Sequence, residues 1–331
     1  MSIDKNKVYS LGLGFVTSKV LFLAAKLNLD HYLSDKPVSI VSLAEKLNFD
    51  QEAFKRFLRI LDAYELIKMD EKFVSKTVYT NQLQDLKTPH LTKNYRAFDQ
   101  LEYTLQTHKP CWDKEYGQAF YPSLGKEELT QFADWCRKSG DDWLLGVFAL
   151  YDFSKFKKLV DVGGGQGHFL AEVLSRNTHQ EGILLDQPEV VAGAKEVLAH
   201  KNCLNRVSII GGDFFKQVPD TGDCYLLCRV LLNWNDEKAV SILNSCYHSM
   251  SDKTKLLVID FILPDKSHPH YLRTALSDLN LLGLIDSKNR NKTEWRYLVE
   301  QSRLKLNKII ISDSSLQPEP FAPIVILECT K

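Results

Sequence analysis

The sequence predicts an α/β fold in which a doubly wound, mostly parallel sheet ends in an antiparallel strand and follows a mainly α-helical winged-helix domain. Two observations lead to this expectation. In residues 154–331 short apolar runs alternate with segments of helical spacing, the order that builds a parallel sheet with right-handed crossovers. Residues 1–100 place their apolar side chains mainly at helical spacing, and residues 101–153 form a helical, aromatic-rich connection.

In the first domain a two-helix unit is followed by a hairpin. The segment Ser42–Glu45 fits a capping box, and Asp50 can cap the next helix, whose apolar residues recur from Phe54 to Tyr64. An apolar run, Leu66–Met69, and an alternating run, Phe73–Tyr79, flank a charged turn and indicate two strands. Together these elements predict a winged helix-turn-helix.

A winged helix can bind DNA or dimerise. The helix Gln51–Tyr64, which would read DNA, is largely apolar and carries only Lys55, Arg56 and Arg59 as basic residues. We therefore favour a structural or dimerising role. The earlier helix, about Val8–Leu27, is too apolar for a solvated arm, so we expect it to pack against a second subunit in a homodimer; a core within one chain is the alternative.

The connecting segment, 101–153, is rich in aromatic side chains, most of which we expect in the core. Clefts between domains are preferred ligand sites, so part of this segment is expected to border a cleft for a small planar acceptor. The candidate cleft residues are His108, Trp112, Trp135 and Cys136.

The last domain contains a series of short apolar runs that predict strands. The expected parallel strands are Leu159–Val162, Gly182–Leu185, Val207–Ile210, Cys224–Leu227 and Leu256–Phe261. The final two, Lys308–Ser312 and Ile324–Glu328, are expected to form an antiparallel edge.

A glycine-dense turn follows the first of these strands. Gly163, Gly165 and Gly167 remove side chains where the backbone must approach a ligand or adopt positive φ, and a helix is predicted from His168 to Ser175. A tight turn without a ligand is the alternative. The adjoining strand, the helix and a second acid favour a nucleotide-type site.

That second acid is Asp186, which lies at the end of the next strand, where a doubly wound sheet places the carboxylate that binds ribose hydroxyls. A dinucleotide fingerprint requires glycine at position 168, which is histidine here. The run Asp161-Val-Gly163-Gly164-Gly165-Gln-Gly167 fits better the Asp-x-Gly-x-Gly-x-Gly loop of enzymes that bind S-adenosylmethionine (SAM) and release S-adenosylhomocysteine.

The charge and cysteine content limit the partners. With 42 basic and 42 acidic residues among 331, the chain has no net field to attract nucleic acid or an anionic membrane. No apolar run reaches the roughly 18 residues of a membrane span, and no signal-peptide core is present. Seven scattered cysteines without a Cys-x-x-Cys pair favour a reducing compartment and argue against zinc. We expect a cytoplasmic protein with no metal.

With these motifs, nearly the whole chain resembles a bacterial member of the SAM-dependent O-methyltransferase family of the plant caffeate type, whose catalytic domain has the class I methyltransferase fold. The resemblance implies that the winged domain dimerises and that Asp186 binds the ribose. It also implies that Asp213 and Phe214 flank the adenine and that the glycine loop passes the methionine portion. Cys228 stands where the family commonly has a lysine beside the cofactor.

The catalytic block departs from the family pattern. The family reads His-Asp-Trp, with histidine as the general base, whereas this chain has Leu232, Asn233 and Trp234. The family's two orienting glutamates correspond to Asp260 and Asn289. The base and one orienting acid are thus replaced together, and the block is similar to that of the anthracycline-tailoring branch.

Three classes of function follow. The favoured one is an O-methyltransferase that acts on a small aromatic or polyketide-like hydroxyl or carboxyl acceptor by proximity and orientation. The second is a SAM-binding enzyme of hydroxylase, decarboxylase or pericyclase type that uses the cofactor's charge without methyl transfer. The third is a winged-helix regulator that senses a ligand. Asn233 could hydrogen-bond an acceptor or cap a helix, and His108 is the best placed substitute base.

Overall fold

The computed structural model describes residues 5–87, 89–125, 127–129, 131–132, 141–313 and 323–331. They divide into two compact units, with the boundary between Tyr95 and Arg96; Gln131 and Phe132 group with the first unit. The helices within residues 98–123 thus belong to the same unit as the large sheet. Our division of the chain at residues 100 and 153 stays a prediction.

The N-terminal unit combines short helices with a small antiparallel sheet. Its helices are α1 (Lys5–Gly12), α2 (Gly14–Lys26), α3 (Leu29–Tyr32), α4 (Ile40–Lys46), α5 (Gln51–Ala63), the 3-10 helix η1 (Thr80–Leu86) and most of α6 (Pro89–Ala97). Its strands pair in the order β1 (Val38–Ser39), β3 (Phe73–Lys76) and β2 (Ile67–Met69), all antiparallel. The predicted helix pair and hairpin are therefore present, with a third strand that the sequence analysis missed.

One of the two expected helix starts differs from expectation. The capping box at Ser42 is wrong: α4 begins earlier, and the Ser39 side chain caps it by accepting a hydrogen bond from the Ser42 N–H at 3.3 Å. Pairing of Val38 with β3 brings the chain to the helix start before Ser42. Asp50 does cap α5, since its Oδ1 accepts from the Ala53 N–H at 2.8 Å.

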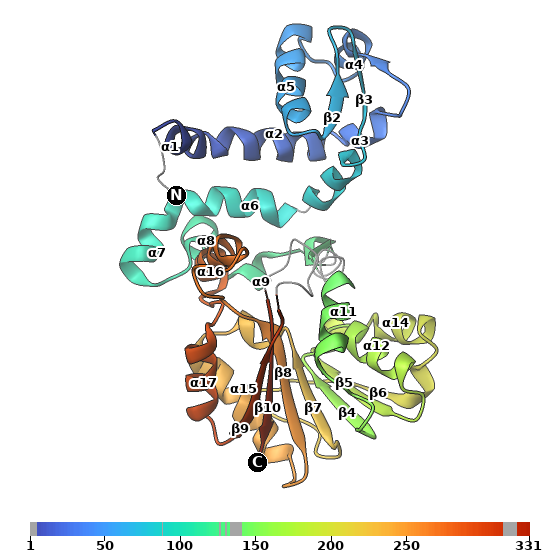
Figure 1. Cartoon of the computed structure of the whole chain (residues 1–331), viewed down its shortest axis with the longest axis vertical. Helices are drawn as coiled ribbons and strands as arrows, with labels where there is room; N and C mark the ends of the chain where they lie inside the picture. The colour runs from blue at the N-terminus through green and yellow to red at the C-terminus, as the bar shows by residue number, and fades with distance from the viewer. Residues whose placement is uncertain (1–4, 88, 126, 130, 133–140, 314–322) are drawn as a thin grey trace. The chain divides into compact units, whose positions relative to one another are not determined.

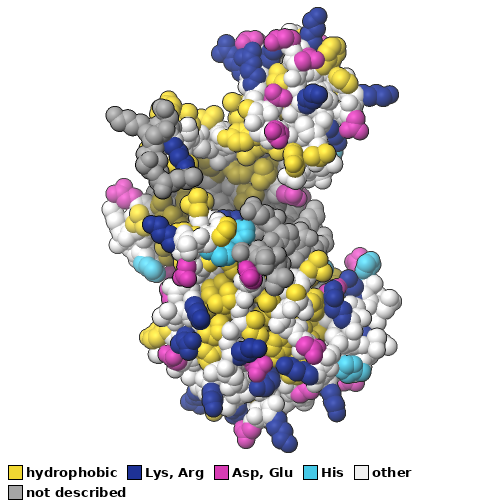
Figure 2. Space-filling view, in the orientation of Figure 1, with side chains coloured by type: hydrophobic (Ala, Val, Ile, Leu, Met, Phe, Trp, Pro, Cys, Tyr) yellow, Lys and Arg dark blue, Asp and Glu magenta, His cyan; other side chains and the backbone are white. Residues whose placement is uncertain are grey.

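The predicted helix from Val8 to Leu27 is two helices, because the chain breaks at Leu13 between two glycines, which weaken helices. Tyr9 and Leu11 of α1 are 71% and 67% exposed, whereas Ala24 and Ala25 at the end of α2 are buried in the core of this unit. Figure 2 shows hydrophobic side chains on the surface over α1 and α2. The stretch Lys7–Lys26, with a mean hydropathy of 1.6, is also long and apolar enough to cross a membrane.

The second unit contains a mixed sheet of seven strands in the order β6-β5-β4-β7-β8-β10-β9 (Figure 1). The parallel strands are β4 (Lys158–Val162), β5 (Glu181–Asp186), β6 (Val207–Gly211), β7 (Cys224–Cys228) and β8 (Lys255–Phe261). β10 (Ile324–Thr330) lies antiparallel between β8 and β9 (Lys305–Ile311). The predicted doubly wound sheet with an antiparallel end is confirmed.

Helices cover both faces of this sheet, as Figure 1 shows. One face packs against α15 (Asp236–Ser249) and α17 (Lys292–Glu300), and the other packs against α11 (Asp141–Leu150), α12 (His168–Arg176) and α14 (Ala194–His200). Neighbouring strand residues serve opposite faces: Leu159 belongs to the second core and Val160 to the first. Two buried cores therefore hold the sheet rigid.

This unit contains further short helices and one longer helix, α16. They are η2 (Phe98–Gln100), α7 (Leu101–Thr107), α8 (Cys111–Tyr116), α9 (Phe120–Ser123), α13 (Pro188–Val191), η3 (Leu204–Arg206), η4 (Leu231–Asn233) and α16 (Tyr271–Ile285). α16 packs against α7 and α8. The carboxyl ends of the parallel strands carry the glycine loop, Asp186 and η4, so the sheet brings these segments to one edge.

Candidate cofactor and acceptor site

The glycine loop adopts the backbone conformation that its composition predicts. Gly163, Gly165 and Gly167 have φ values of +73°, +63° and +83°, which side chains other than glycine rarely tolerate. Gly164 has no such φ, but a Cβ there would collide with the Asp161 carboxylate. α12 starts directly after the loop, so its amino end faces the loop. The backbone is therefore open to a ligand.

Asp186 joins the end of β5 to this loop. Its Oδ2 accepts a hydrogen bond from the Gly165 N–H at 2.8 Å, and its Oδ1 accepts from the Gln187 N–H at 2.7 Å. Burial raises the pKa of this carboxyl, against the effect of the two N–H groups. Each oxygen keeps a second lone pair, so the carboxylate can receive two neighbouring hydroxyls such as those of a ribose.

Asp161 lies fully buried at the end of β4, beside Gly164. Neither of its carboxylate oxygens has a hydrogen-bond partner among the residues that the structure describes. Burial, and then the nearby Asp186 charge, raise its pKa to about 7. A cationic group close to the loop would stabilise the charged form. The open backbone and the two carboxyls fit a cofactor that carries a ribose and a positive charge, as SAM does.

The predicted adenine-side residues lie at the same edge. The Phe214 ring approaches the backbone of Gly163, since a Cβ there would lie 3.3 Å from the ring. Phe215 stacks edge-to-face with Trp234 at 5.0 Å between centroids, which links this loop to the catalytic block. Asp213 is exposed, and its Oδ1 accepts from the Phe215 N–H at 2.9 Å, so it shapes its own turn.

Cys228 ends β7 between two acids. Burial raises the pKa of its thiol well above the ordinary value, and the Asp161 charge acts in the same direction. The thiol is therefore neutral at physiological pH. It supplies none of the positive charge of the lysine that the resemblance places there.

The catalytic block forms the short helix η4. The backbone N–H of Leu232 donates to Asp260 Oδ2 at 3.1 Å, and Asp260 Oδ1 accepts from the Phe261 N–H at 2.8 Å. Burial raises the pKa of Asp260 to about 7, partly offset by these two bonds. Asn233 donates through its side-chain amide to the Arg229 carbonyl at 3.1 Å, and it is Asn235 that caps α15. Asn233 as a helix cap is therefore wrong.

Asn289, at the position of the second orienting acid, is buried and faces α16. Its side-chain amide donates to the Thr274 carbonyl at 3.3 Å, and its backbone N–H donates to Asp278 Oδ1 at 2.6 Å. These bonds anchor the loop between α16 and α17.

The next residue, Arg290, was missed by the sequence analysis. Its fully buried guanidinium donates to the carbonyls of Leu231 and Trp234 at 2.9 and 2.8 Å and to Asp236 Oδ1 at 2.8 Å. Two of its three partners are backbone atoms, which leave no signal in a sequence. The one trace in the sequence is an arginine five residues before the helical Trp295.

The expected acceptor-side residues are dispersed. His108 ends α7 with an 81% exposed side chain, and its Nε2 lies 3.5 Å from Asp286 Oδ1. Trp112 is fully buried, and its indole N–H donates to Ser123 Oγ at 3.0 Å, so it belongs to the helical core here. Trp135 and Cys136 lie outside the described residues.

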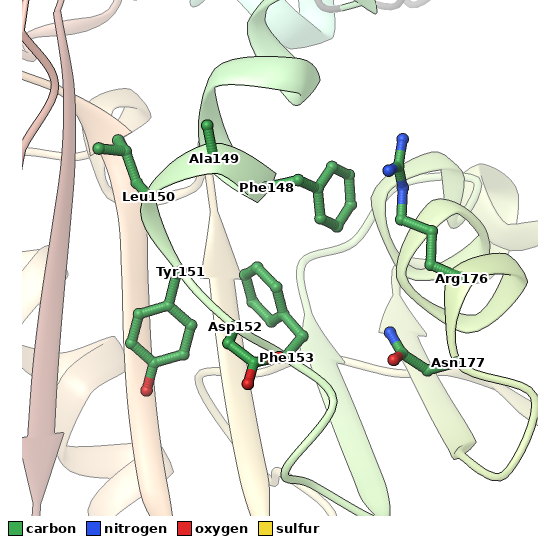
Figure 3. Close-up of a pocket in the computed structure, with 8 residues that line it drawn as sticks. All are labelled: Phe148, Ala149, Leu150, Tyr151, Asp152, Phe153, Arg176 and Asn177. Atoms are coloured by element: carbon green, nitrogen blue, oxygen red, sulfur yellow. The ribbon is translucent and has the colours of Figure 1, made fainter.

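A cavity of about 370 Å³ lies elsewhere in this unit. Figure 3 shows that its lining comes from the end of α11, the segment 151–153 and the end of α12. These residues lie just before β4 or at the end of α12, so the cavity lies towards the amino ends of the parallel strands. The glycine loop lies at the carboxyl ends. This cavity is therefore not the cofactor site.

Comparison with known proteins places this site in a family. Residues 98–303 match the model of the O-methyltransferase domain, and residues 9–83 match that of the O-methyltransferase dimerisation domain. The chain belongs to this O-methyltransferase family. It is a SAM-dependent methyltransferase whose cofactor is SAM, as the glycine loop and the two acids indicate. Among the described residues no group of side chains could hold a metal ion.

Individual relatives are similar over nearly the full length. The phenazine O-methyltransferase PhzM of Lysobacter antibioticus is 29% identical over 322 residues, which is 94% of each chain. The aclacinomycin 10-hydroxylase RdmB of Streptomyces purpurascens is 28% identical over 330 residues, 95% of this chain and 87% of that protein. The structure of the mitomycin 7-O-methyltransferase MmcR superposes with a TM-score of 0.87 at 25% identity, covering 99% and 97% of the two chains.

Proposed function

We propose that this methyltransferase acts on a hydroxyl or carboxyl oxygen of a small aromatic or polyketide-like molecule, and that it works by proximity and orientation without a general base. The observation that supports this proposal is the surroundings of Leu232. At the family's base position stands a side chain that cannot take a proton. Asp260 is buried against backbone amides, and Asn289 donates to a helix carbonyl.

In the proposed mechanism the acceptor arrives ionised, its proton having gone to solvent. Bound SAM supplies an electrophilic methyl group on a positively charged sulfur. Asp186 would hold the ribose, Phe214 and Asp213 would border the adenine, and the loop from Gly163 to Gly167 would pass the methionine portion. Holding two reactants in the reactive geometry can lower a barrier by about 7–11 kcal/mol, so an acidic acceptor needs no base.

The acceptor itself would be held near Asn233, whose carbonyl oxygen stays available because the structure records its amide nitrogen as the donor to Arg229. Other cleft residues are proposed from the connecting segment, His108, Trp135 and Cys136 among them. Trp112 is fully buried, so it would support these cleft residues from the core and would not contact the acceptor.

We also propose that the enzyme is a homodimer formed through residues 1–100. The dimerisation-domain match covers α2 and the second half of α1, whose exposed apolar side chains need a covering surface in water. A second copy of the same helices would supply it.

The direct test is transfer from SAM labelled in its methyl group to phenols and aromatic acids whose pKa values range from about 4 to about 10. If proximity is sufficient, labelled product forms with the acidic members, and the rate follows the ionised fraction of each acceptor. A rate independent of acceptor ionisation would indicate an enzyme base instead.

One observation favours a second candidate, a SAM-binding enzyme that does not transfer the methyl group. A relative of 28% identity is named as a hydroxylase and not as a methyltransferase, which supports this candidate. Under this alternative the sulfonium charge would stabilise an anionic intermediate. Mass spectrometry distinguishes the two candidates. A methyltransferase consumes SAM, whereas the second candidate changes the acceptor and leaves SAM unconsumed.

A further inference from the structure

The turn Leu231–Trp234 is fixed through its backbone. On one side, Asp260 accepts the Leu232 N–H at 3.1 Å. On the other side, Arg290 donates to the carbonyls of Leu231 and Trp234, and Ser287 Oγ donates to the carbonyls of Leu232 and Trp234. One N–H and three carbonyls of the turn therefore have partners from other segments.

Asp260 holds two segments together through hydrogen bonds. It lies in β8 with no exposed surface, and its two oxygens accept N–H groups from η4 and from the end of its own strand. A general base must come within hydrogen-bond distance of the proton it removes. A carboxylate enclosed in this way cannot meet the hydroxyl of an acceptor.

We propose that Asp260 is a positioning residue for methyl transfer: through the Leu232 N–H it sets the place of the turn that carries the Leu232 and Asn233 side chains, and so the pose of the acceptor. This inference rests on the proposed function. In the family pattern a histidine side chain is oriented by acids. Here the acid orients the backbone, and an apolar side chain takes the place of the histidine.

The residue type fits this role. An aspartate in β8 reaches the Leu232 amide, whereas a glutamate would carry its carboxylate one methylene farther. Arg290 acts as the counterpart, because its guanidinium holds two carbonyls of the turn and is itself held by Asp236. A displacement of about 1 Å at such a turn can reduce turnover by about a hundredfold, since orientation supplies the rate.

The test uses the full-length protein and three variants. Asp260→Asn keeps the shape of the side chain, but its amide can accept only one of the two N–H groups. Asp260→Glu keeps a carboxylate. Asp30→Asn is the matched control. Asp30 is also fully buried and held on both oxygens, since it accepts a hydrogen bond from Gln84 at 2.8 Å and forms an ion pair with Lys87 at 3.1 Å, but it lies in the N-terminal unit.

The decisive readout is amide hydrogen exchange of the peptide that contains Leu232, measured by mass spectrometry without an acceptor. In Asp260→Asn we expect exchange there to be about tenfold faster or more, with β10 unchanged, and in Asp260→Glu we expect part of the protection to return. Asp30→Asn should leave this peptide as in wild type. Unchanged exchange at Leu232 in Asp260→Asn would overturn the inference.

The second readout is kinetic, with labelled SAM and a hydroxynaphthoic acid as probe. In Asp260→Asn we expect kcat to fall about tenfold to a hundredfold, while SAM affinity by calorimetry changes less than about threefold. Loss of all transfer with normal exchange would make Asp260 a proton acceptor and contradict the proposal. If wild type transfers nothing, the proposed function fails, and the exchange result still decides whether Asp260 holds the turn.

Discussion

The carboxylate of Asp186 accepts a hydrogen bond from the backbone N–H of Gly165 at 2.8 Å. This bond ties the end of β5 to the glycine loop after β4, so the two segments that would hold the ribose and the methionine portion of SAM form one unit. The main chain supports the same link, because the Gly163 N–H donates to the Leu185 carbonyl at 2.8 Å.

Replacement of Asp186 should therefore weaken cofactor binding. Asp186→Ala removes the proposed ribose partner and leaves Gly165 without its acceptor, for which we expect a loss of about 1–3 kcal/mol in SAM binding. Titration calorimetry measures it. Asp252→Ala, an exposed acid just before β8 at the amino edge of the sheet, is the control and should bind SAM normally. Equal affinity for both variants would contradict the assigned site.

The glycine loop allows a comparison of neighbouring substitutions. Gly165→Ala places its Cβ in open space, so it should cost only about 1–2 kcal/mol for the left-handed backbone. Gly164→Ala drives a Cβ into the buried Asp161 carboxylate and should remove measurable SAM binding. Chemical denaturation and calorimetry check both. Normal SAM binding by Gly164→Ala would show that the loop or the Asp161 side chain can move to make room for the added Cβ, and would contradict this prediction.

The raised pKa values of Asp161 and Asp260 predict a pH dependence of stability. Burial raises the pKa of both carboxyls in the folded state to about 7, above the ordinary value of 3.8. Between these values the folded state holds protons that the unfolded state releases, so the free energy of unfolding falls as pH rises, by up to about 1.4 kcal/mol per pH unit for each group. The stabilisation is complete below pH 3.8 and is lost as pH passes 7.

Urea unfolding at pH 5, 6, 7 and 8, compared between wild type and Asp161→Asn, measures this slope. The variant should show a shallower decline because one of the two groups no longer titrates. A stability that rises with pH over this range would show that other groups dominate, and parallel curves would assign an ordinary pKa to Asp161.

The exposed helices of the N-terminal unit predict the oligomeric state. Light scattering should give a dimer at micromolar concentration, with an interface in the obligate class above roughly 2,000 Å². Leu11→Asp in α1 should shift the protein towards monomer, whereas Leu204→Asp, an exposed leucine of the catalytic unit, should not. A monomeric wild type would contradict the dimer, and retention by lipid vesicles would point to a membrane role for Lys7–Lys26.

The sheet could be predicted from sequence because its signal is periodic. Apolar runs such as Leu159–Val162 alternate with helices, and the observed β4 differs by one residue. The glycine loop could be found because positive φ requires glycine. Arg290 and the Asp260–Leu232 bond could not be predicted, because their partners are backbone groups brought together by the fold. The break at Leu13 was also missed, because the spacing of apolar residues does not record how the two flanking glycines weaken the helix.

Restoration of the family histidine tests the central claim, catalysis by proximity at a site without a base. Leu232→His should change the rate of methyl transfer to an acidic acceptor by less than about tenfold, because the imidazole would lack an orienting acid at Asn289 and an ionised acceptor gains little from a base that is normally worth a hundredfold or more. The measurement is transfer from labelled SAM by wild type, Leu232→His, and Leu232→His with Asn289→Glu. We predict comparable product from the first two. No product from wild type together with product from the double variant would contradict the account.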